Sequence, residues 1–158
     1  MKIQSSAFEN GGMIPDRFSQ FHENRSPPLD FTGVPQDALS LVLIMEDPDA
    51  PRGTYTHWIA FDIDAGTTGF SENLIPKEVR LGRNDAGGAA YAGPRPPNGE
   101  HRYFFRAYAL DCRLPLPNGS ARTDVESAMR GHVLAEAELM GRYATPLSGA
   151  NDEKTRGK

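Results

Sequence analysis

Glycine and proline interrupt this chain at short intervals, which limits the length that any regular element can reach. The sequence has 16 glycines and 13 prolines among its 158 residues, a larger share than the usual background of roughly 12%. Between them lie three short runs typical of β-strands, residues 39–45, 57–63 and 102–110. The first is almost wholly apolar, which predicts a central strand with both faces covered. The second alternates, with Phe61 and Ile63 on the same face, which predicts a half-buried strand.

One segment, residues 123–143, has the pattern of a helix. Thr123 is a suitable N-cap, and Glu126 completes a capping box with it. Gly131 predicts that the segment divides into two helices or is kinked there, because glycine costs about 1 kcal/mol relative to alanine inside a helix.

Many short strands and one late helix predict a mainly β protein, a β-sandwich with a short C-terminal helical segment. A chain of this length needs only one core, so we expect a single domain over residues 1–147. The remaining residues, 148–158, include no aliphatic side chain larger than alanine. They bury too little to offset the entropy of ordering, so we expect a flexible C-terminal tail.

Charge and composition exclude several classes of partner. The formal net charge is -4, and lysine and arginine are scattered, so we expect no nucleic-acid partner. The chain begins without the apolar segment of a signal peptide, and no later window approaches the length of a membrane span, which predicts a cytoplasmic protein that does not span a membrane. Cys112 is the only cysteine, so we expect a small half-buried residue and neither an intramolecular disulfide nor a Cys-based metal site.

Two stretches about forty residues apart share one design, a loop held by prolines and then a strand that begins with histidine. In residues 45–63 the loop precedes His57, and in residues 91–105 it precedes His101. Because side chains alternate along a strand, Tyr103 points to the same side as His101. If the two strands lie near each other in one sheet, a set of polar side chains converges at one rim. That set is Asp47, Asp49, His57, His101 and Tyr103.

Two imidazoles and a phenol can donate hydrogen bonds to an oxyanion, and a nearby carboxylate can orient a histidine. We therefore hypothesise a site for an anionic group such as phosphate. The same side chains can ligate a metal, although their spacing matches no metal motif. Ordinary proline-stabilised turns with capping aspartates are the simpler alternative. No GxSxG motif and no serine in these stretches provides a nucleophile, so we expect neither an enzyme nor a cofactor.

The two stretches resemble the signature segments of the phosphatidylethanolamine-binding proteins, also called Raf kinase inhibitor-like proteins, and in particular their bacterial branch. The matching segments are "DPDAP" at residues 47–51, "HW" at 57–58 and "GPRPPNGEHRYFFRAYALD" at 93–111. The resemblance extends over nearly the whole chain, from about residue 3 to 145. It implies a two-sheet antiparallel Greek-key β-sandwich with a small anion-binding pocket at one end of the sheets.

The resemblance also implies the pocket residues. They are Asp47, Asp49, Ala50, Pro51, His57, Pro96, Pro97, His101 and Tyr103. It suggests a cis peptide bond, for which Ala50-Pro51 is the candidate, and a homodimer. Bacterial members often have a cysteine where this chain has Arg95, whose guanidinium either reaches the pocket mouth or points into solvent.

We therefore predict a non-enzymatic binding protein for a phosphate-like group or a phospholipid head group, in which His57 and His101 donate to the anion. The alternative is a regulator of a kinase or peptidase that uses the same pocket to recognise a phosphorylated or carboxylate group.

Overall fold

The computed structural model describes residues 1–146, so the predicted tail at 148–158 lies outside the described residues. The elements, in chain order, are β1 (Lys2–Gln4), the 3-10 helix η1 (Asp16–Phe18), β2 (Leu29–Thr32), β3 (Ser40–Asp47), β4 (Tyr55–Asp64), β5 (Gly69–Phe70), β6 (Arg80–Leu81), β7 (Glu100–Leu110), α1 (Arg122–Met129) and β8 (Val133–Ala144). Among the described residues, no helix has the length and apolar character needed to cross a membrane.

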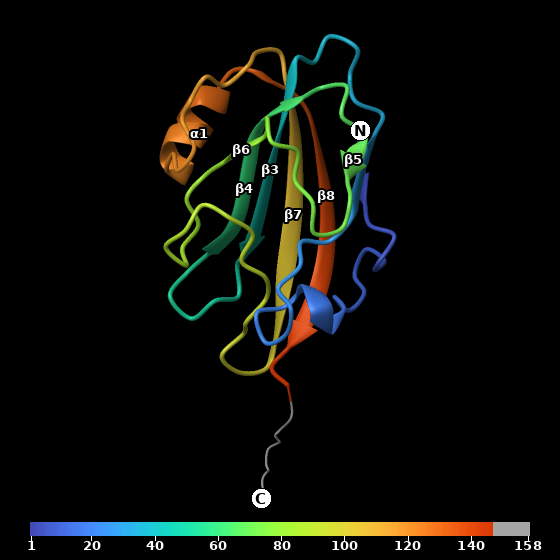
Figure 1. Ribbon diagram of the computed structural model, residues 1–158, viewed down its shortest axis with the longest axis vertical. Helices are drawn as coiled ribbons and strands as arrows, with labels where there is room; N and C mark the ends of the chain where they lie inside the picture. The colour runs from blue at the N-terminus through green and yellow to red at the C-terminus, as the bar shows by residue number, and fades with distance from the viewer. Residues whose placement is uncertain (147–158) are drawn as a thin grey trace, which may run out of the picture.

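The strands form two antiparallel sheets, which confirms the predicted mainly β fold. One sheet has the strand order β1-β2-β5, and the other has the order β6-β4-β3-β7-β8. The two strand pairs β3-β4 and β7-β8 lie side by side because β3 also pairs with β7. Figure 1 shows that the long strands of the larger sheet run along the long axis of the molecule, and that α1 lies beside the upper left of this sheet.

The larger sheet is covered on both faces, and this explains its apolar central strand. All eight residues of β3 are buried, as predicted for a strand with both faces covered. On one face, Leu43 and Met45 belong to a core that includes Phe31 of the smaller sheet. On the other face, Val42 and Ile44 belong to a second core. The second core is completed by α1, through Val125 and Met129.

The prediction of a half-buried strand at residues 57–63 was wrong, because β4 is covered on both faces. Its alternation also breaks at Asp62, which has a positive φ of 54° and lies at a bulge in the pairing with β3. Beyond the bulge, Ile63 packs in the inter-sheet core, whereas Phe61 packs under α1. A bulge adds one residue to a strand and so reverses the face of the residues that follow.

The predicted helix over residues 123–143 was wrong beyond its first two turns. The helix ends at Met129, its N-cap is Ala121 without a side-chain hydrogen bond, and no capping box forms. Gly131 has a φ of +83° and belongs to a turn. The chain then continues as β8, which pairs along the whole of β7. The helix therefore precedes the last strand and is not C-terminal.

The proposed cis peptide bond at Ala50-Pro51 was also wrong. The described part of the chain has no cis peptide bond. Cys112 is partly buried, as expected.

A buried carboxylate joins β3 to β7 and α1 next to the end of β3. Glu46 is 8% exposed and accepts hydrogen bonds from Arg106 Nε at 3.0 Å and Arg122 Nη2 at 2.5 Å. Burial raises the pKa of this carboxyl, but the hydrogen bonds and charges of the two arginines outweigh burial and lower the pKa below its usual value. The ionised carboxylate thus holds three elements together.

We predict that Glu46→Gln lowers the free energy of unfolding by about 2 kcal/mol, because two partly buried guanidinium groups lose the buried carboxylate that they share and keep only more exposed partners, Glu138 and Glu126. The matched control is Glu126→Gln. Glu126 pairs with the same Arg122, four residues away in α1, but its side chain is 44% exposed, so its loss costs about 0.5 kcal/mol or less. Urea unfolding of both variants measures the difference. Equal effects of the two substitutions would contradict the role given to Glu46.

Candidate functional site

The two histidine-bearing stretches meet at one edge of the larger sheet. β3 ends at Asp47, and β4 begins beside it because Asp47 pairs with Tyr55. β7 runs antiparallel to β3, with Glu46 opposite Phe104. The start of β7, which carries His101, therefore lies at the same edge. This is the convergence that the sequence predicted, and the pairing of β3 with β7 produces it.

A cavity of about 620 Å³ opens at this edge. The lining residues include seven of the nine predicted from the sequence, namely Asp47, Ala50, Pro51, His57, Pro97, His101 and Tyr103. Their role in binding stays a prediction. The cavity is formed by loops on one side and by the ends of strands on the other, so its histidines are held by sheet hydrogen bonds.

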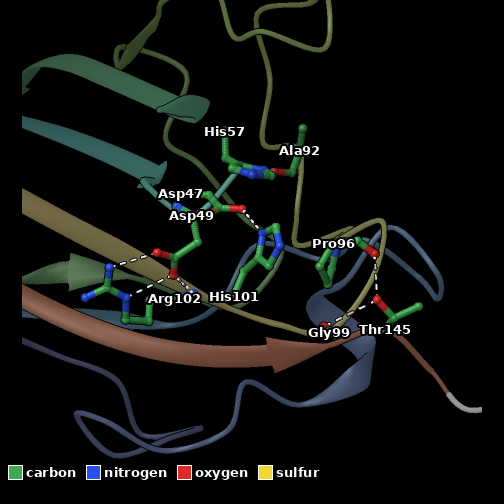
Figure 2. Close-up of polar contacts among 9 residues, drawn as sticks. All are labelled: Asp47, Asp49, His57, Ala92, Pro96, Gly99, His101, Arg102 and Thr145. Atoms are coloured by element: carbon green, nitrogen blue, oxygen red, sulfur yellow. Dashed lines mark hydrogen bonds and ion pairs between the residues drawn. The ribbon is translucent and has the colours of Figure 1, made fainter. Parts of the chain in front are cut away.

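His101 is oriented by Asp47. The Nδ1 atom of the ring lies 2.6 Å from Asp47 Oδ2, and both side chains are less than 10% exposed. The other carboxylate oxygen of Asp47 accepts the backbone N–H of Asp49 at 2.8 Å, so the carboxylate cannot rotate freely. Figure 2 shows the contact between Asp47 and His101. Since Asp47 accepts from Nδ1, Nε2 is the ring nitrogen of His101 that remains for a ligand.

His57 is oriented by a backbone carbonyl. Its Nδ1 atom lies 2.7 Å from the oxygen of Ala92, and a carbonyl can only accept, so Nδ1 carries the proton. Burial lowers the pKa of His57 despite opposing effects from the Ala92 carbonyl and from Asp47, which favours the neutral ring. In that form Nε2 is an acceptor. We predicted that His57 donates to an anion, and this tautomer contradicts that role for the neutral ring.

Aromatic rings hold His57 in place. The centre of the Tyr55 ring lies 4.7 Å from the centre of the imidazole ring. The centre of the Tyr103 ring lies 5.2 Å from it, in an edge-to-face arrangement. The Tyr103 side chain is fully buried, and among the described residues its hydroxyl has no hydrogen-bond partner. Burial, and then the charge of Asp47, raises the pKa of this phenol well above its usual value. Tyr103 therefore keeps its proton and lines the cavity as an unpaired donor.

A close backbone approach supports the loop behind the pocket. A Cβ atom on Gly93 would lie 1.9 Å from the carbonyl oxygen of Phe18, so only glycine fits there. The N–H of Gly93 donates to Asn24 Oδ1 at 2.8 Å, and its carbonyl accepts from Gln20 Nε2 at 2.9 Å. The hydroxyl of Tyr91 donates to the same Phe18 carbonyl. The N-terminal segment thus fixes the loop that supplies the Ala92 carbonyl to His57.

Two of the predicted residues do not line the cavity. Asp49 turns away and forms a two-point ion pair with Arg102, with distances of 2.8 and 2.9 Å between guanidinium nitrogens and carboxylate oxygens. Pro96 is buried, and its carbonyl accepts the Thr145 hydroxyl at 2.9 Å. Both contacts appear in Figure 2. These residues brace the two loops instead of facing the cavity.

Several lining residues were missed by the sequence reasoning. They are Gln20, Arg52, Gly53, Tyr55, Asp85 and Ala86. Tyr55 had a usable signal, because it lies two residues before His57 on the same strand. Arg52 follows the first proline loop directly. Gln20 and Asp85 come from distant loops whose local sequence gives no indication of the site.

Arg95 is an exposed residue and is among those that line the cavity. Its guanidinium carbon lies 5.7 Å from the centre of the Phe21 ring. Arg52 and Asp85 are also among the lining residues. The pocket is thus lined by charges of both signs around neutral aromatic walls.

The histidines and carboxylates of the cavity do not form a compact ligand set. Within residues 1–146, no three of their donor atoms approach within 4.8 Å of one another. A zinc or iron site needs three or four donors around one point, so this geometry does not favour the metal alternative for the pocket.

The fold and this edge pocket define a class of two-sheet β-sandwich proteins with a cavity at one end of the larger sheet, and the comparisons with known proteins name the family. The family model described as phosphatidylethanolamine-binding protein matches residues 4–144. The chain belongs to the phosphatidylethanolamine-binding protein family.

Individual relatives agree with this assignment. A UPF0098 protein of Methanothermobacter thermautotrophicus is 50% identical over 149 residues, which cover 90% of this chain and 98% of that protein. A solved structure of a phosphatidylethanolamine-binding protein homolog from Chlamydia trachomatis, CT736, superposes with a TM-score of 0.88 at 40% identity, covering 92% of this chain and 97% of that one. The Escherichia coli protein YbcL gives a TM-score of 0.85 at 27% identity, covering 92% and 98%.

The pair of Asp49 and Arg102 predicts a specific acid sensitivity. Hydrogen bonds from the Arg102 guanidinium lower the pKa of Asp49 from 3.8 to about 2. A carboxyl whose pKa is lower in the folded state stabilises the fold above its unfolded pKa, and this contribution is lost as pH falls toward the folded pKa. We therefore predict that Asp49→Asn lowers the free energy of unfolding by up to about 1 kcal/mol at pH 6. The difference between this variant and wild type should disappear between pH 4 and pH 2. Urea unfolding at each pH measures it.

The control for this prediction is Asp37→Asn. Asp37 is exposed, and the described residues provide no ion pair for it. Its substitution should leave the pH profile of the wild type unchanged. A difference between Asp49→Asn and wild type that persists unchanged down to pH 2 would contradict the ion-pair explanation.

Proposed function

We propose that the pocket binds a small anionic, phosphate-like group without chemical turnover, either a free phosphorylated compound or a phospholipid head group. The observation that carries the proposal is the pair of buried imidazoles. His57 and His101 each have Nδ1 engaged inside the protein, and both rings line one cavity. The Nε2 edges are therefore the polar groups that the protein leaves for a ligand.

The polar groups of the pocket suit a phosphate that still carries a proton. Neutral His57 accepts at Nε2, so it can pair with a P–OH group. His101 in its protonated form donates from Nε2, and the adjacent Asp47 offsets the added charge. Tyr103 offers a hydroxyl proton. Arg52 and Arg95, which are also lining residues, attract an anion and can approach its remaining oxygens.

The size of the cavity supports the proposal of a bound head group. A volume of about 620 Å³ lies in the range of small-molecule pockets, which is roughly 300 to 1,000 Å³. It therefore leaves room for a group attached to the phosphate. The lining residues within the described chain include no serine, threonine, cysteine or lysine. Nucleophiles of the serine, threonine, cysteine and lysine type are thus missing from the wall, whereas carboxylates, imidazoles and phenols are present.

The test is a titration of the protein with inorganic phosphate and with phosphoethanolamine, followed by NMR of the histidine side chains. We expect saturable shifts of His57 and His101 and none of His22, which lies outside the pocket. His101→Ala should weaken binding at least about tenfold, as expected for the loss of a hydrogen bond to a charged group. The matched control is His22→Ala, which should bind like wild type.

Tyr103→Phe is a second variant that keeps the fold. It removes an unpaired buried hydroxyl, so the free energy of unfolding should stay equal or rise, while phosphate affinity falls. Wild-type protein that shows no shifts with either probe would contradict the proposal. A pull-down that recovers a protein partner with wild type and loses it with His101→Ala, in the absence of phosphate binding, would instead support the regulator predicted as the alternative.

A further inference from the structure

A second group of chemically reactive side chains lies at the opposite end of β7 from the pocket. His101 is the second residue of this strand, whereas Asp111 and Cys112 follow its last residue, Leu110. The turn between α1 and β8 brings His132 to the same place, where the backbone N–H of Asp111 donates to the His132 carbonyl at 3.0 Å. The group is thus separated from the pocket by the full eleven-residue length of a strand.

The side chains of this group approach one another closely. One donor atom from each of Asp111, Cys112 and His132 lies within 4.8 Å of the other two. The ring nitrogen Nδ1 of His132 lies 2.7 Å from Asp111 Oδ1. Carboxylate, thiolate and imidazole are the three kinds of ligand that zinc takes in proteins, with bonds of about 2.0 to 2.3 Å. Donor atoms around a tetrahedral zinc are about 3.4 Å apart by that geometry, so small side-chain rotations suffice to reach it.

The backbone already holds these three residues in position. The N–H of His132 donates to the Met129 carbonyl at 2.9 Å, and Gly131 adopts the positive φ that the turn requires. The carbonyl of Cys112 accepts the buried Ser40 hydroxyl at 2.5 Å. Because the chain is fixed on both sides of the group, a cation would order only side-chain rotamers when it binds.

Exposure of the group fits a site with an open position. The side chains of Asp111 and His132 are each 46% exposed, and Cys112 is partly buried. A cation held by the three residues would therefore keep one face toward solvent, where water completes the coordination. The mixture of ligand types also matters, because a thiolate disfavours Mg²⁺ and Ca²⁺, which prefer oxygen.

We propose that Asp111, Cys112 and His132 form a surface site for Zn²⁺, with three protein ligands and one water. The proposal departs from the sequence expectation that Cys112 forms no Cys-based metal site. That expectation did not consider His132, which lies twenty residues beyond Cys112 and was placed inside a helix. It is independent of the proposed anion pocket, and either can exist without the other.

The test uses the untagged, reduced full chain. Zn²⁺ is titrated by calorimetry, and Co²⁺, which substitutes for zinc and is coloured, is titrated by absorption spectroscopy. We expect one Zn²⁺ per chain and a thiolate-to-cobalt charge-transfer band. Cys112→Ser should abolish that band, and His132→Ala should weaken zinc binding at least about tenfold.

Two control variants test whether other histidines contribute to zinc binding. His22 lies 3.9 Å from Asp16, so it forms a histidine-aspartate pair without a thiol, and His22→Ala should leave zinc binding unchanged. His101→Ala should also leave it unchanged, since the pocket is at the other end of β7. Thermal unfolding of each variant checks that the fold is intact.

The proposal is overturned by any of three results. The first is the absence of saturable zinc binding to wild type. The second is zinc affinity that Cys112→Ser and His132→Ala leave intact. The third is binding that is lost in His101→Ala, which would place the metal in the pocket.

Discussion

The contact on which the site depends is the 2.6 Å hydrogen bond between Asp47 and His101. It joins the last residue of β3 to the second residue of β7, 54 positions further along the chain. Because both side chains are buried, loss of either partner leaves a polar group without compensation. The same bond decides which ring nitrogen faces the cavity. Stability and the proposed ligand recognition therefore depend on the same contact.

The second histidine of the pocket, His57, is held by a backbone carbonyl instead of a carboxylate. His57 donates to the Ala92 carbonyl, and the loop that carries this carbonyl is pressed against the N-terminal segment at Gly93 and Phe18. One imidazole is thus held by a carboxylate and the other by a backbone dipole. The carboxylate of Asp47 can balance a positive charge on the first ring, whereas burial lowers the pKa of the second and so favours its neutral form. This asymmetry suits a ligand that has both acceptor oxygens and a proton.

Local patterns in the sequence predicted the structure correctly where only burial and the two-residue period of a strand decide it. The apolar run that became β3 and the shared face of His101, Tyr103 and Phe105 follow from such patterns. Prediction failed where distant contacts decide. Residues 133–144 are rich in alanine, glutamate and leucine, which favour a helix, yet pairing with β7 makes them a strand. Asp49 looked like a pocket residue, but Arg102 draws it outward, and no local signal places Gln20 or Asp85 at the cavity.

The most direct test of this account is the tautomeric state of the two histidines in the free protein, read from the ¹⁵N chemical shifts of the imidazole rings. The structure requires the proton of each neutral ring to be on Nδ1, since Asp47 and Ala92 accept there. We predict protonated Nδ1 and a free Nε2 for both His57 and His101. Neutral rings protonated on Nε2 instead would mean that these contacts do not form, and the pocket described above would not exist.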